Sequence, residues 1–245
     1  MTIHPFNLDT IDPSWQSCIP KALGKMDPTY LNTLYHNTHW LPGHDKIFNA
    51  FSIPVHKVNY ILFGESPYPR AASANGYAFW DAAVLNLWSE TGLNKKVNRA
   101  TSLRHIIKML LICEGVLNPG HTTQPDIANI NKEAFVTTNQ ELFNNFLSHG
   151  FLLLNASLVL QPMNVRKDAL SWHPFISHVL DFLCHERPNL SLILLGKIAN
   201  TINTLVPQNS IKKLYAEHPY NHSFIQNEEV IQFFMPLHLL KKETK

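Results

Sequence analysis

Three short runs of almost uninterrupted apolar residues constrain the fold of this chain most strongly. They are residues 57–63 (KVNYILF), 150–154 (GFLLL) and 190–195 (LSLILL), and each stops at a glycine or an asparagine. Runs of this length without polar alternation are typical of strands buried on both faces of a parallel sheet. Helical patterns at 101–113, 132–147 and 175–184 lie between and around them. This alternation predicts the α/β class.

The remaining segments extend this organisation. Residues 1–46 contain amphipathic stretches at 19–26 and 30–36, which predict a helical lead-in to a core of residues 47–240. A last short apolar segment at 211–215 runs into Glu217 and His218. Because no Gly/Ser-rich stretch or charge run could serve as a flexible linker, we expect residues 1–245 to form a single domain.

Composition excludes several classes of protein. Hydrophobic residues make up 45% and charged residues 16%, which is typical of a globular chain and excludes a disordered one. A formal net charge of +2 excludes a protein that binds polyanions through bulk charge alone. Residues 1–10 carry no long apolar run, and no transmembrane-length run occurs, so we expect no signal peptide, no membrane contact and a cytoplasmic protein, or a nuclear one in a eukaryote.

Neither cysteines nor histidines predict a metal site. Cys18, Cys113 and Cys184 lie far apart without Cys-x-x-Cys spacing, which argues against a disulfide framework, and Cys113 and Cys184 are expected to be buried small apolar residues. The cluster of His36, His39 and His44 invites a zinc interpretation. No carboxylate or cysteine completes a recognisable metal spacing, so we predict no metal.

Ligands of open parallel sheets bind beyond the carboxyl ends of the strands, where loops converge. That rule nominates the loops at 64–76, 155–162, 196–200 and 218–224. They contain an amide at Asn155 and an imidazole at His218. Each residue also has a simpler interpretation, because asparagine commonly forms turns at strand ends and His218 could be an ordinary loop residue. Phe79, just beyond the first loop, could likewise be a core side chain.

Read together, these loops carry a recognisable series of motifs. Residues 61–79 read ILFGESPYPRAASANGYAF, preceded by IFNAF at 47–51, and 150–155 read GFLLLN. Trp172 and Phe175 follow, and 217–223 read EHPYNHS. In order and spacing they resemble the uracil-DNA glycosylases, most closely the family with G-Q-D-P-Y-H, L-L-L-N and H-P-S-P-L-S at successive strand ends. The resemblance implies a three-layer α/β/α fold with a small central parallel sheet, and a DNA repair enzyme.

The resemblance also implies roles for individual residues. Such enzymes flip the target nucleotide out of the duplex and read the base in a pocket. Phe79 would stack on the base, Asn155 would pair with the uracil edge, and Tyr68 would fill the space beside C5 and exclude thymine. His218 would donate a hydrogen bond to O2 while negative charge develops on the leaving uracil.

Position 66 departs from the family. The aspartate that positions the water and stabilises the sugar cation is replaced by Ser66. The pKa of a serine hydroxyl is far too high for it to be ionised at neutral pH, so without a partner it cannot serve as a general base. Losing such a base typically lowers the rate roughly 10²–10⁴-fold. Other branches of the superfamily carry G-E-A-P-G here, so Glu65 is the candidate to hold the water. The expected catalytic set is therefore His218, Glu65 and Ser66.

Further departures concern the DNA-binding rim. The motif histidine is Pro69, the intercalating leucine is His222, and the proline-rich loop is reduced to residues 100–103. Lys197 and Arg70 could supply positive charge for phosphates. The expected DNA-binding residues are Ser102, Lys197, Pro219, His222 and Ser223.

Two hypotheses follow. The first is a monomeric, cofactor-free glycosylase that removes uracil, or a related deaminated or modified base, from DNA, with chemistry attenuated or altered at Ser66. The second is a catalytically inactive homologue that acts as a DNA-binding or scaffold protein. The complete base-reading set of Asn155, Phe79 and His218 favours the first, whereas Ser66 and His222 favour the second.

Overall fold

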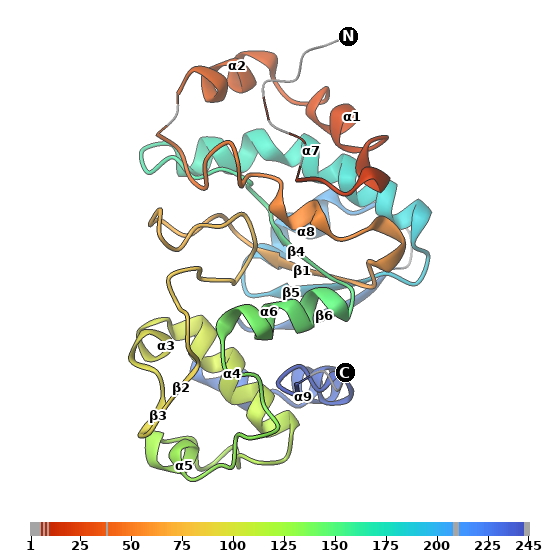
Figure 1. The fold of residues 1–245 in the computed structure, drawn as a ribbon. Coiled ribbons are helices and arrows are strands. Elements are labelled where there is room, and N and C mark those ends of the chain that lie inside the picture. The colour runs from red at the N-terminus through yellow and green to blue at the C-terminus, as the bar shows by residue number, and fades with distance from the viewer. Residues whose placement is uncertain (1–5, 7, 9, 38, 208–210, 243–245) are drawn as a thin grey trace.

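A four-stranded parallel sheet lies at the centre of the molecule (Figure 1). The computed structural model describes residues 6, 8, 10–37, 39–207 and 211–242. Part of the N-terminal stretch on which the absence of a signal peptide was predicted, namely 1–5, 7 and 9, lies outside them. The strand order is β4-β1-β5-β6, with β1 and β5 in the middle.

The described elements have these bounds. The strands are β1 Tyr60–Gly64, β2 Trp88–Ser89, β3 Gly92–Leu93, β4 Phe151–Asn155, β5 Ser191–Leu195 and β6 Lys212–Ala216, with β2 and β3 pairing as a small hairpin. The helices are α1 Ile19–Leu23, α2 Pro28–His36, α3 Lys95–Arg99, α4 Thr101–Cys113, α5 Gln124–Ala128, α6 Asn139–Ser148, α7 Val165–Glu186, α8 Ile198–Leu205 and α9 Glu228–Phe234. Short 3-10 helices occur at Pro13–Trp15, Asn49–Ser52, Val55–Lys57, His222–Gln226 and Met235–Leu237.

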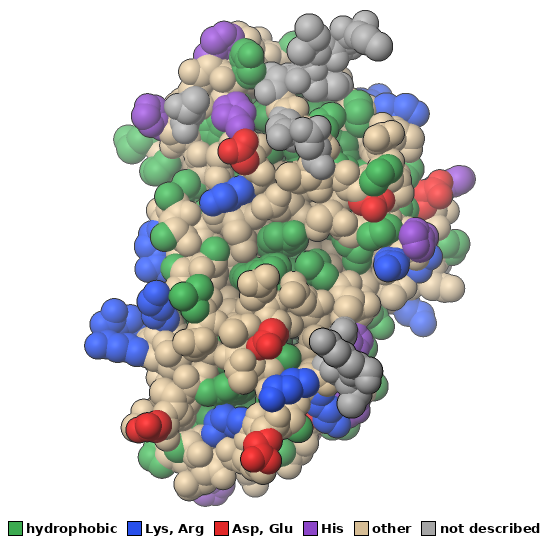
Figure 2. All heavy atoms as spheres, in the orientation of Figure 1, with side chains coloured by type: hydrophobic (Ala, Val, Ile, Leu, Met, Phe, Trp, Pro, Cys, Tyr) green, Lys and Arg blue, Asp and Glu red, His purple; other side chains and the backbone are tan. Residues whose placement is uncertain are grey.

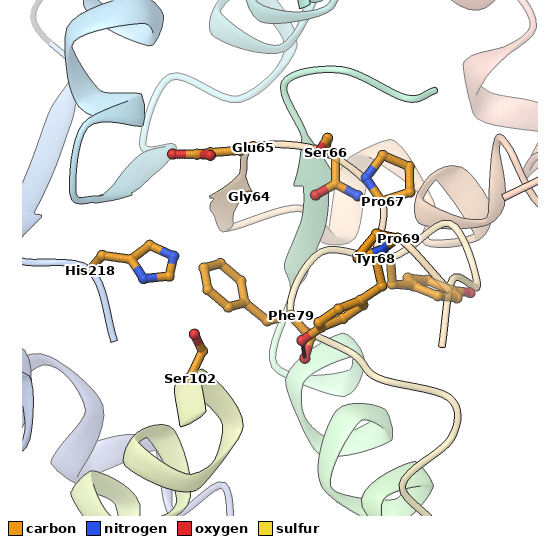
Figure 3. A pocket seen from close by; sticks show the side chains of 11 residues that line it. Gly64, Glu65, Ser66, Pro67, Tyr68, Pro69, Phe79, Ser102 and His218 are labelled. Atoms are coloured by element: carbon orange, nitrogen blue, oxygen red, sulfur yellow. Dashed lines mark hydrogen bonds between the residues drawn. The ribbon is translucent and has the colours of Figure 1, made fainter. Parts of the chain in front are cut away.

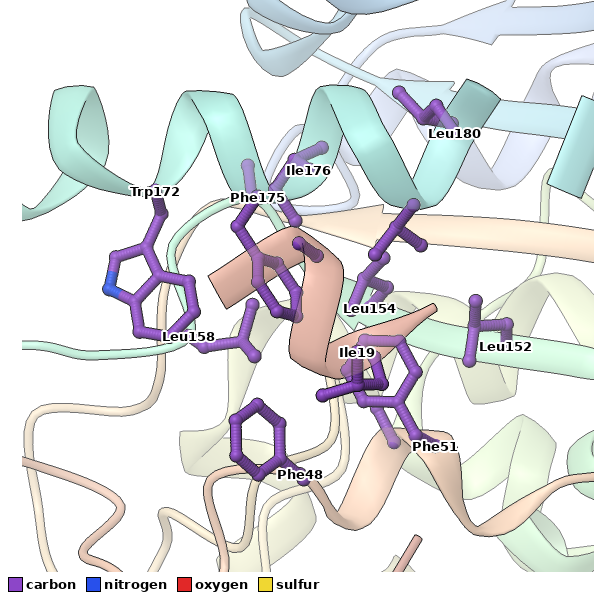
Figure 4. Packing of buried hydrophobic residues seen from close by; sticks show 14 of the residues in the cluster. Ile19, Phe48, Phe51, Leu152, Leu154, Leu158, Trp172, Phe175, Ile176 and Leu180 are labelled. Carbon is purple, nitrogen blue, oxygen red and sulfur yellow. The ribbon is translucent and has the colours of Figure 1, made fainter. Parts of the chain in front are cut away.

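Apolar strand residues pack into two separate hydrophobic cores, one on each face of the sheet. Leu152 and Leu154 of β4 point into the first, together with α7 and the N-terminal helix α1 (Figure 4). Leu153, between them, points into the second, which is built from α4, α6 and α9. Successive strand side chains face opposite ways, so a strand covered on both faces must be apolar throughout. The fold is therefore a three-layer α/β/α sandwich, as the resemblance predicted, and it belongs to the α/β class that the apolar runs predicted.

The loop after β4 is fixed to the N-terminal helices by a buried carboxylate. Asp168 of α7 accepts hydrogen bonds from Tyr30 Oη at 2.7 Å and from the Gln161 backbone amide at 2.7 Å. The Gln161 side-chain amide donates a third, at 2.8 Å. A charged group without a cation partner requires such bonds when it is buried. They fix the course of the chain between Asn155 and α7.

Several predicted boundaries were wrong. The helix expected at 132–147 begins only at Asn139, because Thr138 and Glu141 form a reciprocal capping box at that point. The helix expected at 175–184 extends over Val165–Glu186 and passes through Pro174. A proline inside a helix costs about 3 kcal/mol. The buried face of α7, which packs on the sheet, outweighs that penalty. Cys184 is half-buried, whereas Cys113 is buried as predicted.

The described residues form neither a membrane-spanning helix nor a cluster of metal-binding side chains. Within the ranges given above, no helix is both long and apolar enough to cross a bilayer. The same part of the chain brings no three His, Cys, Asp or Glu side chains close enough to hold a metal ion, and His36, His39 and His44, which are close in sequence, do not form such a group.

Candidate active site

The loops after β1, β4 and β6 and the first turn of α4 enclose a cavity of about 220 Å³ at the carboxyl edge of the sheet (Figure 3). A cavity of this size suits a single nucleobase better than a larger ligand. All the residues predicted to bind the base or to act in catalysis line it, together with residues that the sequence did not single out. The lining consists of Gly64, Glu65, Ser66, Pro67, Tyr68, Pro69, Tyr77, Phe79, Ser102, Asn155 and His218.

Asn155 is the last residue of β4 and is only 3% exposed. Its partner in the neighbouring strand is Gly64, the last residue of β1. None of the side-chain hydrogen bonds found among the described residues involves the Asn155 amide, which borders the cavity. A buried amide normally takes part in such bonds. Its donor and acceptor atoms are therefore free for a ligand in the cavity.

Phe79 and Tyr68 form an aromatic wall. Phe79 has a φ of 62°, a left-handed conformation that is uncommon for an aromatic residue. Two hydrogen bonds hold it there, from the Ala78 amide to the Leu153 carbonyl at 3.0 Å and from Tyr68 Oη to the Phe79 carbonyl at 3.1 Å. Burial raises the pKa of Tyr68, which keeps the phenol protonated as this hydrogen bond requires. These bonds fix the Phe79 ring at the wall of the cavity.

His218 lies beside Phe79, with the two ring centres 5.9 Å apart and the planes inclined by 33° (Figure 3). The Tyr220 backbone N–H donates to His218 Nδ1 at 3.1 Å, so the proton of the neutral ring is on Nε2. Burial lowers the pKa of His218, and the charge of Glu65 opposes this effect. At neutral pH His218 is thus a neutral imidazole with an Nε2–H donor.

A glycine makes room for this histidine. Gly196 follows β5 with a φ of 77°, and a Cβ atom at this position would lie 2.7 Å from the Cβ of His218. Only a residue without a side chain allows both that conformation and that approach. The loops after β5 and β6 therefore pack directly against each other.

Glu65 and Ser66 occupy the turn after β1. The Ala156 amide donates to the Gly64 carbonyl at 2.9 Å and the Ser157 amide to the Glu65 carbonyl at 3.0 Å, so the backbone of the turn is fixed. Glu65 is exposed and Ser66 is half-buried. Both also line a second cavity of about 220 Å³, whose other residues include His173 and Lys197. None of the side-chain hydrogen bonds found among the described residues involves the Ser66 hydroxyl, which borders both cavities.

Of the five predicted DNA-binding residues, four line a cavity or are exposed, and one is buried. Ser102 lines the base-sized cavity, Lys197 is exposed beside the second cavity, and His222 and Ser223 are exposed. Pro219 is buried. Arg70 is exposed but forms an ion pair with the buried carboxylate of Asp81 at 3.2 Å. In Figure 2, Lys and Arg side chains gather along the left edge, the side on which α3 lies in Figure 1; Lys95, Lys96 and Arg99 of that helix are exposed.

Sequence reasoning missed several residues that shape the cavity. Gly64, Pro67 and Tyr77 line it without having been assigned a role. Tyr77 lies two residues before Phe79 in the same motif stretch, which was a usable signal. Gly64 shapes the cavity through its pairing with Asn155 in the neighbouring strand. That pairing depends on the strand order, which the sequence alone does not give.

The cavity, the strand order and the loops define an α/β protein with a nucleobase-sized site at the carboxyl edge of its sheet. Comparison with known proteins agrees. The crystal structure of wild-type UNG from Nitratifractor salsuginis is 38% identical and superposes with a TM-score of 0.91, covering 96% of this chain and 95% of that one. The uracil-DNA glycosylase of Exiguobacterium sibiricum is 26% identical over 192 residues, covering 78% of this chain and 74% of that protein.

A more distant structure shares the fold alone. Mimivirus uracil-DNA glycosylase is 16% identical, with a TM-score of 0.60 and coverage of 88% of this chain and 72% of that one. No family model matches the sequence. On the similarity to the Nitratifractor protein over nearly the whole of both chains, this chain belongs to the uracil-DNA glycosylase superfamily.

Proposed function

We propose that this protein removes uracil from DNA by flipping the nucleotide into the cavity at the end of β1 and hydrolysing its N-glycosidic bond. The observation that carries the proposal is the convergence of Asn155, Phe79, Tyr68 and His218 on one cavity of nucleobase size. All these groups come from one chain, so no second copy is needed to complete the cavity, and we propose that a monomer acts on DNA. The same cavity would take a related deaminated base that presents the same hydrogen-bonding edge.

Base recognition rests on the free amide of Asn155. Its oxygen accepts from N3–H of uracil and its nitrogen donates to O4, and a base with the opposite pattern would leave buried polar groups unpaired. Phe79 supplies the stacking surface. Tyr68 closes the side of the cavity where a C5 methyl group would sit, because its hydroxyl is fixed to the Phe79 carbonyl.

Bond cleavage places negative charge on the departing uracil. The C1′–N1 bond breaks, its electron pair goes to the base, and the sugar gains cationic character. The Nε2–H of His218 donates to O2 where that charge accumulates, which is electrostatic stabilisation by a prearranged donor. A water oxygen then bonds to C1′ and releases a proton.

Glu65 is the residue we assign to this water. It lines the base-sized cavity, carries a carboxylate that can accept the proton, and places negative charge beside the sugar cation. Ser66 lines the same cavity but carries no charge, and no side-chain hydrogen bond found among the described residues engages its hydroxyl. The rate therefore depends on Glu65, and Ser66 takes no proton.

A cleavage assay on uracil-containing oligonucleotides, single- and double-stranded, tests these assignments. Wild type should cleave, Glu65→Gln should lose roughly 10²–10⁴-fold in rate, and Glu90→Gln, which changes an exposed glutamate in the β2–β3 turn, should behave as wild type. Ser66→Asp should help little, because two neighbouring carboxylates raise each other's pKa.

Two other outcomes would change the proposal. If Ser66→Asp cleaves roughly 10²–10⁴-fold faster than wild type, which is the contribution typical of a general base, then Glu65 does not activate the water. In that case the missing aspartate at position 66 limits a site that is otherwise competent. If neither wild type nor Ser66→Asp cleaves while both bind DNA, the protein is better explained as a non-catalytic DNA-binding homologue that carries Ser66 in place of the catalytic aspartate.

A further inference from the structure

A histidine outside the cavity holds the loop that carries His218. His105 lies on α4 and is 4% exposed, and its Nδ1 is 2.7 Å from the carbonyl oxygen of Pro219. Pro219 directly follows His218 in the chain. The proposed chemistry gives His105 no role, although its contact with the loop is short and buried.

The partners of His105 determine which of its nitrogens carries the proton. A carbonyl oxygen can only accept, so Nδ1 must donate to Pro219. On the other side of the ring, Arg104 Nη2 lies 3.5 Å from Nε2, and a guanidinium can only donate. Both contacts require the same neutral tautomer. The buried ring is therefore a fixed donor aimed at the loop.

The loop is thus fixed from two directions. The Tyr220 amide fixes the His218 ring from within the loop, and His105 fixes the Pro219 carbonyl from α4. The His222 ring packs edge-on against His105, with the ring centres 5.7 Å apart. One turn earlier on the same helix, Ser102 lines the base-sized cavity. Helix α4 therefore sets the position of the His218 loop relative to the cavity wall.

We infer that His105 is a positioning residue for His218, which it holds against the base through the neutral Nδ1–H bond to Pro219. This inference rests on the proposed function. It predicts that loss of the bond lowers the rate of bond cleavage rather than binding to undamaged DNA. A displacement of about 1 Å at a reacting group can lower the rate on the order of 10²-fold.

Two substitutions separate the hydrogen bond from the packing. His105→Asn places a side-chain N–H close to the position of Nδ1, whereas His105→Leu fills the space without a donor. In single-turnover cleavage His105→Leu should lose roughly 10–10²-fold, and His105→Asn should recover most of the rate. His149→Leu is the matched control, because it removes a similar bond, from the His149 ring to the Asn145 carbonyl at 2.8 Å, remote from the cavity.

A double-mutant cycle tests whether His105 acts through His218. In a His218→Ala background, His105→Leu should have almost no further effect on single-turnover cleavage, because residues that act as a unit are not additive. An equal loss in both backgrounds would overturn the inference, as would a loss that His105→Asn does not restore.

Nuclear magnetic resonance gives a readout that does not depend on cleavage. The ¹⁵N shifts of the His218 ring should report an unprotonated Nδ1 in wild type, His105→Asn and His149→Leu, and a solvent-like mixture of tautomers in His105→Leu. If the ¹⁵N shifts of the His218 ring are the same in His105→Leu as in wild type, His105 does not position His218, even if wild type cleaves. A wild type that fails to cleave but shows this shift pattern would instead contradict the proposed function alone.

Discussion

Gly64 and Asn155 pair across adjacent parallel strands, and a Cβ atom added to Gly64 would overlap Oδ1 of Asn155. The same Cβ would lie 3.0 Å from the Cβ of Ala78. The end of β1 therefore has room for the Asn155 amide only because position 64 has no side chain. Recognition of the base depends on a residue that offers no chemical group of its own.

Gly64→Ala should displace the Asn155 amide and weaken uracil binding, because the added Cβ would overlap Oδ1 of Asn155 at the position from which it faces the cavity. We expect a loss of at least about tenfold in affinity for a uracil-containing strand, equivalent to roughly 1.4 kcal/mol. Fluorescence anisotropy measures it. Gly120→Ala is the control, since a Cβ there would meet only Asn118 Oδ1 at 3.5 Å; equal losses in the two variants would argue against this explanation.

Asn155→Ala should separate specific from non-specific binding. The variant removes the amide that reads the base and leaves the phosphate contacts in place, so affinity for uracil-containing DNA should fall while affinity for undamaged DNA stays nearly constant. Titration of matched oligonucleotides that differ in one base measures both. Parallel losses on the two DNAs would exclude Asn155 as the base reader.

Tyr68→Ala should open the side of the cavity that faces C5. Thymine should then become a detectable substrate while uracil cleavage slows, because removing the ring makes space for a methyl group and loosens Phe79, whose carbonyl accepts from Tyr68. Cleavage of thymine- and uracil-containing strands measures the ratio. Tyr35→Ala, on α2, should leave that ratio unchanged. A variant that still rejects thymine completely would show that Tyr68 does not exclude the methyl group.

Stability should fall as the pH drops below about 6.5, the ordinary pKa of histidine. Burial lowers the pKa of His105, His218 and His173 in the folded protein. Below 6.5 the unfolded chain therefore binds more protons than the folded one, and the free energy of unfolding decreases with falling pH. Urea denaturation between pH 8 and pH 5 measures this slope. His105→Asn should reduce it, and an unchanged slope would contradict the assignment.

Lys197→Gln should lower the salt dependence of DNA binding. A lysine that contacts one phosphate contributes about 0.9 to the slope of log affinity against log salt for duplex DNA and about 0.7 for a single strand. Lys197 is exposed next to Glu65 and Ser66. Lys21→Gln on α1 serves as the control. If both variants keep the wild-type slope, Lys197 does not contact a phosphate.

The sequence predicted the strands and the site better than it predicted helix boundaries. Continuous apolar runs identify strands buried on both faces, and the motifs at their ends place Asn155 and His218 at one edge. The start of α6 was missed because the apolar pattern before Asn139 outweighed the capping signal of Thr138 and Glu141. His105 was missed because nothing local marks it: its partner, Pro219, is 114 residues away.

The strand order also determines when the site can form during synthesis. Strand β1 is an inner strand, and both of its neighbours, β4 and β5, are made long after it. Until they emerge from the ribosome, the apolar β1 has two unpaired edges, which expose it to aggregation and to chaperones. His218 emerges later still, after β6. A nascent chain therefore holds most of the base-reading residues before it can hold a base, and the cavity can be completed only after β6 and His218 have emerged.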